Sequence, residues 1–316
     1  MTKYAIRRVA GLVPTMLLLL VLVVVMINLI PGDIIDLILE EKYSKDDEAR
    51  QVLEHELGLD RALPVRYVEY AAGVFRGDFG QSLWTKQSVG SMILGRAGVT
   101  IEIGVIAILI GATIGIAIGT ISAVRQDSTL DYALRSAAIL GISVPSFAIA
   151  TAIIVFPAIW WGVAPSLRYV SFSEDAIGHI KIIIAPSLVL GLGLAATLMR
   201  LTRTTMLDVL RQDYIRTAHA KGIREAKVIV GHALKNALIP VITLLGLQIA
   251  FLIGGSVITE SVFAIPGVGR LLLSAIANRD YPVVQGVVVI VGFFVMATNL
   301  AVDLSYAWLD PRIRYG

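Results

Sequence analysis

The sequence has no cysteine, few charged residues and only four histidines. The absence of cysteine excludes disulfide bonds, zinc–thiolate sites and thiol nucleophiles. Charged residues make up 16% of the 316 positions, against roughly a quarter in soluble domains. No Gly-x-x-x-x-Gly-Lys-Ser/Thr segment occurs, which excludes a phosphate-binding loop for ATP. The net charge of +3 is too small to indicate a nucleic-acid partner. The histidines are scattered and indicate no metal or cofactor site: His55, His179, His219 and His232.

Hydrophobic residues are abundant instead, at 56% of the chain, with a mean hydropathy of +0.79. These values are typical of a membrane protein. About 20 helical residues cross a hydrocarbon core of roughly 30 Å. Six uncharged runs are long enough or nearly so, and we expect six transmembrane helices: Val9–Gly32, Ile103–Val124, Ser136–Leu167, Ile182–Met199, Asn236–Thr259 and Tyr281–Val302.

Two of these runs need comment. The first follows Lys3, Arg7 and Arg8, as a signal peptide would. It is longer than a usual signal core and no small-x-small cleavage site follows, so we interpret it as a retained helix. The third exceeds one span and contains three prolines, so we expect its outer end to be irregular or interfacial: Pro145, Pro157 and Pro165.

The charge distribution predicts the orientation. An even number of spans puts both termini on one side, with the 125–135 and 200–235 loops; that side carries fifteen Lys and Arg, against twelve on the other. Because cytoplasmic loops are rich in Lys and Arg, we expect both termini in the cytoplasm. The segment 31–95 is then periplasmic. Within it, Asp46–Asp60 is expected to begin an amphipathic helix, and the segment is either a docking surface or a solvated cap.

The 200–235 loop is too long for a simple turn and contains two helical patterns. The first consists of Met206, Leu207, Leu210, Tyr214, Thr217 and Ala218. The second consists of Ala226, Ile229, Val230, Ala233, Leu234, Ala237 and Leu238. Gly222 lies between them, where the chain can reverse. The residues alone leave two interpretations open: a docking element for a cytoplasmic protein, or a basic helix on anionic lipid.

Longer segments carry a family resemblance. They are "QDYIRTAHAKG", "HALKNALIPVITLLGLQ", "GGSVITESVFAIPGVGRLL", "NRDYPVVQG" and "DLSYAWLDPRIRYG", together with "RRVAGLVPTMLLLLVLVVVMINLIPGD" at the start of the chain. The chain resembles, nearly end to end, the permeases of binding-protein-dependent ABC importers, in the branch that carries dipeptides, oligopeptides, glutathione or nickel. The resemblance implies an importer permease for a small peptide, with no cofactor and no enzymatic activity of its own.

The resemblance also implies partners and a coupling site. The partners are a second homologous permease, two cytoplasmic ATPase subunits, an extracytoplasmic binding protein and membrane lipid, with no nucleic acid. The coupling site is the cytoplasmic EAA loop, expected here at Arg216, Thr217, Ala218, His219, Ala220, Lys221 and Gly222. Ala218 and Ala220 are small enough for close approach to an ATPase, and Gly222 makes the turn. Arg216 stands where the family pattern has glutamate, so the ion pair of that glutamate does not carry over.

Polar residues near the spans have structural and functional interpretations. Gln248 and Ser256 are eight apart on the fifth run and share a helix face that could line the translocation path. Glu102 lies near the outer start of the second run, at the headgroup level or at the substrate entrance. Asn299 and Asp303 are expected to pair with Arg200 or Arg203. Four glycines of the second run predict close helix packing: Gly104, Gly111, Gly115 and Gly119.

The sequence thus predicts an all-α membrane protein with six transmembrane helices, of the type I ABC importer permease fold. The expected parts are a tail and first helix (1–30), a periplasmic segment (31–95), a transmembrane domain (96–309, with the coupling loop at 200–236) and a cytoplasmic tail (310–316). The expected location is the inner membrane of a bacterium or archaeon. A nickel-chelate importer and a self-sufficient secondary transporter remain alternatives.

Overall fold

The computed structural model describes residues 2–29, 60–163 and 168–309. The helix expected at Asp46–Asp60 lies, apart from its last residue, outside these ranges. The described residues form helices joined by short loops, and their only strand-like pairing is an isolated bridge between Gln81 and Ser88. The helices are α1 (Thr2–Leu29), α4 (Leu63–Phe75), α5 (Val89–Val124), α6 (Thr129–Ser143), α7 (Ser146–Trp161), α8 (Ala176–Leu210), α9 (Asp213–Ala220), α10 (Glu225–Lys227), the π-helix η1 (Val228–Leu234), α11 (Lys235–Val262), α12 (Val268–Ala277) and α13 (Tyr281–Leu309).

Five stretches of these helices are long and apolar enough to cross a membrane: Arg8–Met26, Val89–Val124, Ala176–Leu210, Glu225–Gln248 and Tyr281–Val302. The pair α6 and α7 makes a sixth if it counts as one broken span. This agrees with the predicted all-α membrane fold. The helices α5 and α8 are much longer than the uncharged runs within them, because their polar ends continue the same helices.

The third uncharged run is broken about a third of the way along. The helices α6 and α7 meet at an angle of 94° around Val144 and Pro145. Proline lacks an N–H and pushes the preceding residue out of the helical region, and Val144 is accordingly extended, at φ −86° and ψ 123°. The sequence predicted irregularity at the outer end. The break lies at Pro145 instead, Pro157 lies inside α7, and Pro165 lies outside the described residues.

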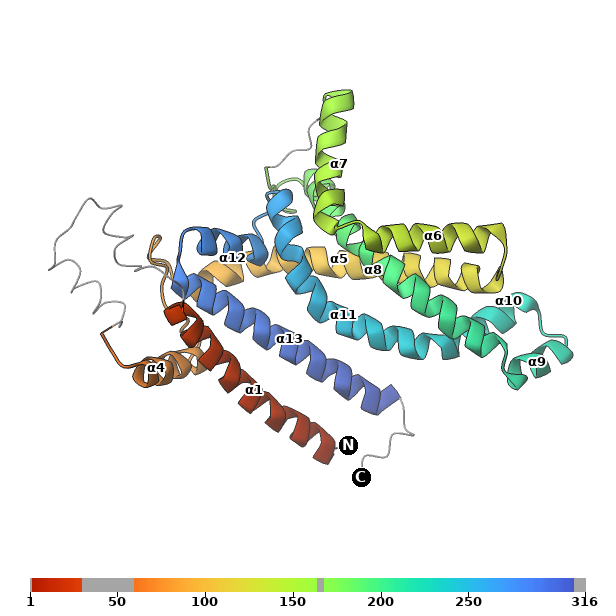
Figure 1. Cartoon of the computed structure of the whole chain (residues 1–316), viewed down its shortest axis with the longest axis horizontal. Helices are drawn as coiled ribbons and strands as arrows, with labels where there is room; N and C mark the ends of the chain where they lie inside the picture. The colour runs from red at the N-terminus through yellow and green to blue at the C-terminus, as the bar shows by residue number, and fades with distance from the viewer. Residues whose placement is uncertain (1, 30–59, 164–167, 310–316) are drawn as a thin grey trace. The chain divides into compact units, whose positions relative to one another are not determined.

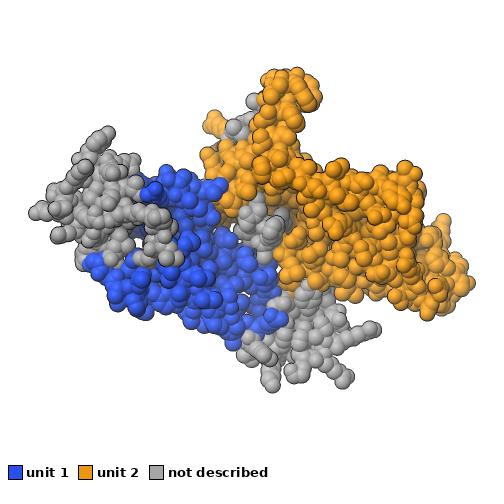
Figure 2. All heavy atoms as spheres, in the orientation of Figure 1, with its two compact units in different colours: residues 1–95, 271–300, 315–316 blue, residues 96–270, 301–314 orange. Residues whose placement is uncertain are grey.

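The chain divides into two compact units, residues 1–95 with 271–300 and 315–316, and residues 96–270 with 301–314 (Figure 2). In the first unit, α1, α4 and α13 share a small core of Leu20, Val23, Ala71 and Val289. A hairpin at 78–88 is held to the corner between α12 and α13. There the carboxylate of Asp280 accepts hydrogen bonds from the Ser82 hydroxyl at 2.5 Å and the Leu83 N–H at 3.1 Å.

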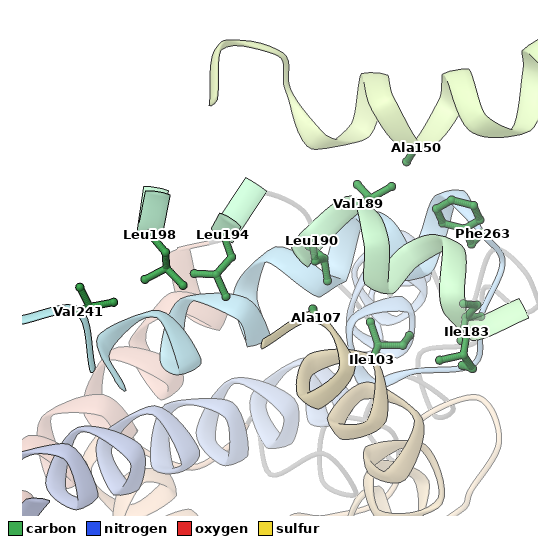
Figure 3. Packing of buried hydrophobic residues seen from close by; sticks show 11 residues of the cluster. Ile103, Ala107, Ala150, Ile183, Val189, Leu190, Leu194, Leu198, Val241 and Phe263 are labelled. Atoms are coloured by element: carbon green, nitrogen blue, oxygen red, sulfur yellow. The ribbon is translucent and has the colours of Figure 1, made fainter. Parts of the chain in front are cut away.

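The second unit is built around α8, the most buried of the candidate spans. Its core joins side chains of α5, α7, α8 and α11 with Phe263 and Ile265, as Figure 3 shows for the labelled residues. The backbone of α5 lies close to α8 because glycine faces it. A Cβ on Gly115 would lie 2.7 Å from the Ala195 carbonyl oxygen, and Gly111 and Gly119 are equally crowded. The predicted glycine packing holds for these three but not for Gly104, which has nothing within 4 Å.

Candidate functional site

The loop between α8 and α11 forms a knob at one end of the second unit (Figure 1). The first sequence pattern placed Met206 to Ala218 on one helix, and this is wrong. The helix α8 ends at Leu210, and α9 starts afresh at Asp213 after an extended residue, Gln212, at φ −73° and ψ 148°. An acidic residue in the first turn favours a new helix start, and Asp213 supplies it.

The helix α9 ends in the glycine turn that the sequence predicted. Gly222 has φ +71°, a conformation that side chains with a Cβ rarely adopt. Its N–H donates to the His219 carbonyl at 2.9 Å, and the Ile223 N–H donates back to the Ala218 carbonyl at 3.3 Å. This pattern satisfies the carbonyl groups at the helix end. No atom lies within 4 Å of a Cβ built on Gly222, so backbone conformation, rather than space, requires glycine.

One face of α9 is buried within the loop. Ile215 and Ala218 are 1% and 7% exposed and pack in a cluster with Met206, Val228, Ala233, Ala237 and Ala123. Ala218 therefore contacts its own chain and does not present a small surface to a partner, contrary to the reason that the sequence suggested. The cluster fixes α9 against α8 and η1.

The other face of α9 is exposed. The guanidinium of Arg216 lies 3.3 Å from the Asp213 carboxylate, with side-chain exposures of 76% and 93%. Thr217, Ala220 and Lys221 are also exposed. His219 lies 3.2 Å from Glu225 across the turn. The structure thus brings Arg216, Thr217 and Ala220 to one outer surface.

A π-helix follows the turn, and nothing in the sequence pattern predicted it. In η1, hydrogen bonds join residues five apart, so Val228 and Ala233 fall on about the same side and are both fully buried. The side-chain amide of Asn236, at the start of α11, donates to the Tyr214 hydroxyl at 3.0 Å and to the His232 carbonyl at 2.9 Å. This contact ties α11 directly to α9.

The two residues expected to line the path differ in their surroundings. Gln248 is partly exposed. Ser256 is 1% exposed and hydrogen-bonds the buried carboxylate of Glu260. Glu260 also accepts from the Thr100 hydroxyl at 2.8 Å and from the Arg270 N–H at 3.0 Å. Ser256 therefore belongs to a polar cluster that joins α5, α11 and the start of α12, and the path role of both residues stays a prediction.

Glu102 binds a histidine. The His179 ring is held by the Glu102 carboxylate at 2.8 Å and the Val170 carbonyl at 2.9 Å, and it is 2% exposed. The rings of Tyr169 and Phe172 contact it edge-on. Burial, and then the negative charges of Glu102 and Glu174, raise the pKa of the Tyr169 phenol. Glu102 thus joins α5 to the first turns of α8, and His179 in turn holds the loop before α8, a role that the sequence could not distinguish.

Arg203 pairs with Asp131 at the start of α6. Two hydrogen bonds join them, at 2.8 and 2.7 Å. The sequence predicted that Arg203 or Arg200 pairs with Asn299 and Asp303. Asn299 does not take part in the Arg203–Asp131 contact, and the side chain of Asp303 lies outside the described residues. Arg200, the other expected partner, is exposed.

Comparison with known proteins identifies the family of the chain. Residues 115–315 match the model of the binding-protein-dependent transport system inner membrane component, and residues 1–104 match the N-terminal model of such membrane components. The MetNI methionine ABC transporter shares the fold, with a TM-score of 0.57 at 16% identity over 69% of this chain and 96% of that chain.

Full-length relatives agree. A relative from Brucella abortus (strain 2308), named as a peptide transport system permease protein, is 40% identical over 315 residues. The match covers 100% of both chains. The dipeptide transport system permease protein of Escherichia coli strain K12 is 35% identical over 338 residues, covering 100% of this chain and 99% of its own. The predicted kind of protein, a membrane-embedded transport component rather than an enzyme, is confirmed. The chain belongs to the family of inner membrane components of binding-protein-dependent transport systems.

Proposed function

We propose that this chain is a permease subunit of an ATP-driven importer and forms part of the path for a small peptide. Relatives named for peptide and dipeptide transport match the chain from end to end, which supports a peptide over a nickel chelate. The permease pairs with a second, homologous permease, and an extracytoplasmic binding protein delivers the substrate. Two separate ATPase subunits bind the cytoplasmic side. Both termini and the α9 loop lie in the cytoplasm, in keeping with the Lys and Arg distribution.

The loop between α8 and α11, which contains α9, is the part of the chain that we expect the ATPase to bind. The helix α8 has 35 residues and is about 52 Å long, whereas the hydrocarbon core is roughly 30 Å thick. The same helix therefore extends well beyond the membrane and holds α9 out in water. A soluble subunit can reach a knob in that position. The apolar cluster around Ile215 and Ala218 packs α9 firmly against α8. A movement of the ATPase bound to α9 would therefore move α8 as well.

Substitutions of two alanines in α9 distinguish an effect on ATPase docking from an effect on folding. Ala220→Leu adds bulk on the exposed face, and we expect the protein to fold normally but to lose ATPase binding and uptake. Ala218→Leu overfills the buried cluster, and we expect it to lower the thermal stability as well. Copurification of the ATPase with the permease, uptake of a labelled dipeptide and the melting temperature measure these effects. Full uptake by the Ala220→Leu protein would contradict the docking role.

The same preparation tests the wider proposal. Uptake should require ATP, the ATPase subunits and the binding protein, with a dipeptide, glutathione and a nickel chelate compared as substrates. Uptake by this chain alone, driven by an ion gradient, would instead identify a secondary transporter.

A further inference from the structure

We propose that the groove receiving α9 presents a carboxylate to Arg216. The charge order of this contact is then the reverse of the family pattern, in which the loop supplies the acid. The inference rests on the proposed docking function and specifies the chemistry of the partner.

The geometry of α9 puts Arg216 at the centre of contact. Residues three and four apart share a helix face, and Asp213, Arg216, Thr217 and Ala220 form such a row, all of them exposed. Thr217 and Ala220 are small, so a partner surface can come close to the helix beside the guanidinium. Arg216 is the only cation in this row and its longest side chain. A protein that covers the row must therefore cover the guanidinium.

The guanidinium has little compensation within its own chain. It pairs with Asp213 at 3.3 Å, and both side chains are largely exposed. Such an exposed ion pair contributes little to the free energy of folding. A guanidinium carries five N–H donors. Covering it without an acceptor would leave a desolvated, uncompensated charge, which strongly disfavours binding. A carboxylate satisfies two donors at once in the bidentate geometry that arginine favours.

The other charged residues near Arg216 also favour an acidic partner surface. Between 208 and 235, the exposed basic residues are Arg211, Arg216, Lys221, Arg224, Lys227 and Lys235, and the exposed acidic residues are Asp208, Asp213 and Glu225. Six positive charges against three negative ones leave an excess of three. An acidic rim on the partner would complement this field and speed association.

Anionic lipid is the other source of negative charge, and the structure of α9 disfavours it. Helices that lie on a membrane insert an apolar face among the lipids. In α9 the apolar side chains Ile215 and Ala218 are already buried in the loop, and the exposed face is polar apart from Ala220 and the ring of Tyr214, which is 43% exposed. The exposed face therefore suits a polar protein groove.

Charge reversal with a matched control tests the inference. The permease complex is placed in nanodiscs of purely zwitterionic lipid, and the Kd of the ATPase subunits is measured over a range of salt concentrations. We expect Arg216→Glu to weaken binding by roughly tenfold or more. Arg216→Lys keeps the charge but loses the bidentate geometry, so we expect a smaller loss. Lys227→Glu makes the same charge change off the row, and we expect less than a threefold effect. Equal losses for Arg216→Glu and Lys227→Glu would show that only net charge matters and would overturn the proposal.

Zero-length crosslinking identifies the acid itself. In complexes of the Arg216→Lys protein, a carbodiimide joins the new amine only to a carboxylate in direct contact. We expect a crosslinked peptide from the ATPase, found by mass spectrometry and absent from the unmodified protein. A crosslink to Asp213 alone would overturn the proposal. If the unmodified permease does not bind the ATPase at all, the docking function fails; if it binds and Arg216→Glu binds equally well, only the carboxylate is ruled out.

Discussion

Asp131 and Arg203 join the start of α6 to the C-terminal half of α8 through a two-point contact, with Nε–Oδ1 at 2.8 Å and Nη2–Oδ2 at 2.7 Å. Asp131 is fully buried, and Arg203 is 16% exposed. Ser122 at the end of α5 donates its hydroxyl to the same carboxylate. One acidic side chain of α6 therefore holds the ends of α5 and α8 to its own helix.

Loss of this carboxylate should destabilise the protein. Asp131→Ala leaves the Arg203 guanidinium without its partner, and we expect a cost of about 3 kcal/mol, at the low end for buried pairs because Arg203 is partly exposed. The melting temperature in detergent measures the effect. Arg200→Gln, on the exposed side of the same helix, should change it little; an equal drop for both would contradict the assignment.

Glycine on α5 should be irreplaceable where α8 crosses it. Gly115→Ala would place a Cβ 2.7 Å from the Ala195 carbonyl oxygen and 2.8 Å from the Leu198 Cβ, so the helices must separate and we expect a lower melting temperature. Gly104→Ala meets nothing within 4 Å. It should be neutral or stabilising by about 0.5–1 kcal/mol, because alanine favours the helix. Comparable melting temperatures for the two variants would refute this account.

The cluster around Glu260 should behave as a unit. The Thr100 hydroxyl donates to Glu260 and accepts from the Val268 N–H at 2.9 Å. We expect Glu260→Gln and Thr100→Val each to destabilise the protein, and the double variant to cost less than the sum, because the second change removes a group already lacking its partner. A double-mutant cycle on thermal stability measures the coupling. Strict additivity would mean that the contact does not contribute.

The hairpin at 78–88 should depend on Asp280. That carboxylate binds Ser82 and Leu83, and Trp84 Nε1 donates to the Asn278 carbonyl at 2.8 Å. Asp280→Ala should loosen the hairpin, and trypsin should then cut faster after Lys86, an exposed residue at φ 58°. Gln81→Ala, which changes an exposed side chain of the same hairpin away from the cleaved bond, is the control and should leave the cleavage rate unchanged.

The sequence predicted those parts of the fold that depend on local chemistry. Apolar runs placed the spans, and Gly222 placed the turn, because a positive φ favours glycine wherever it occurs. The break at Gln212 was missed because apolar residues happen to continue at helical spacing from Leu210 to Tyr214. The π-helix was missed because its signature, Val228 and Ala233 both buried, becomes visible only when the packing is known.

Pairings between helices could not be predicted for a different reason. Charge alone allowed Arg203 several acidic partners, and its partner, Asp131, lies 72 positions away in sequence. The same holds for Glu102 and His179, which are 77 apart. At the candidate site, composition and spacing located the loop, but they could not tell that Ala218 faces inward while Ala220 faces outward.

The length of α8 has a mechanical consequence. One helix joins the knob at α9 to the His179 anchor, and its 35 residues make a rod of about 52 Å. If that rod tilts by about 5° around its midpoint, each end moves by about 2 Å in opposite directions. The glycine-lined contact with α5 would be the point about which α8 tilts. Pro186 lies within α8, and its missing N–H makes it the point where such a lever bends most easily.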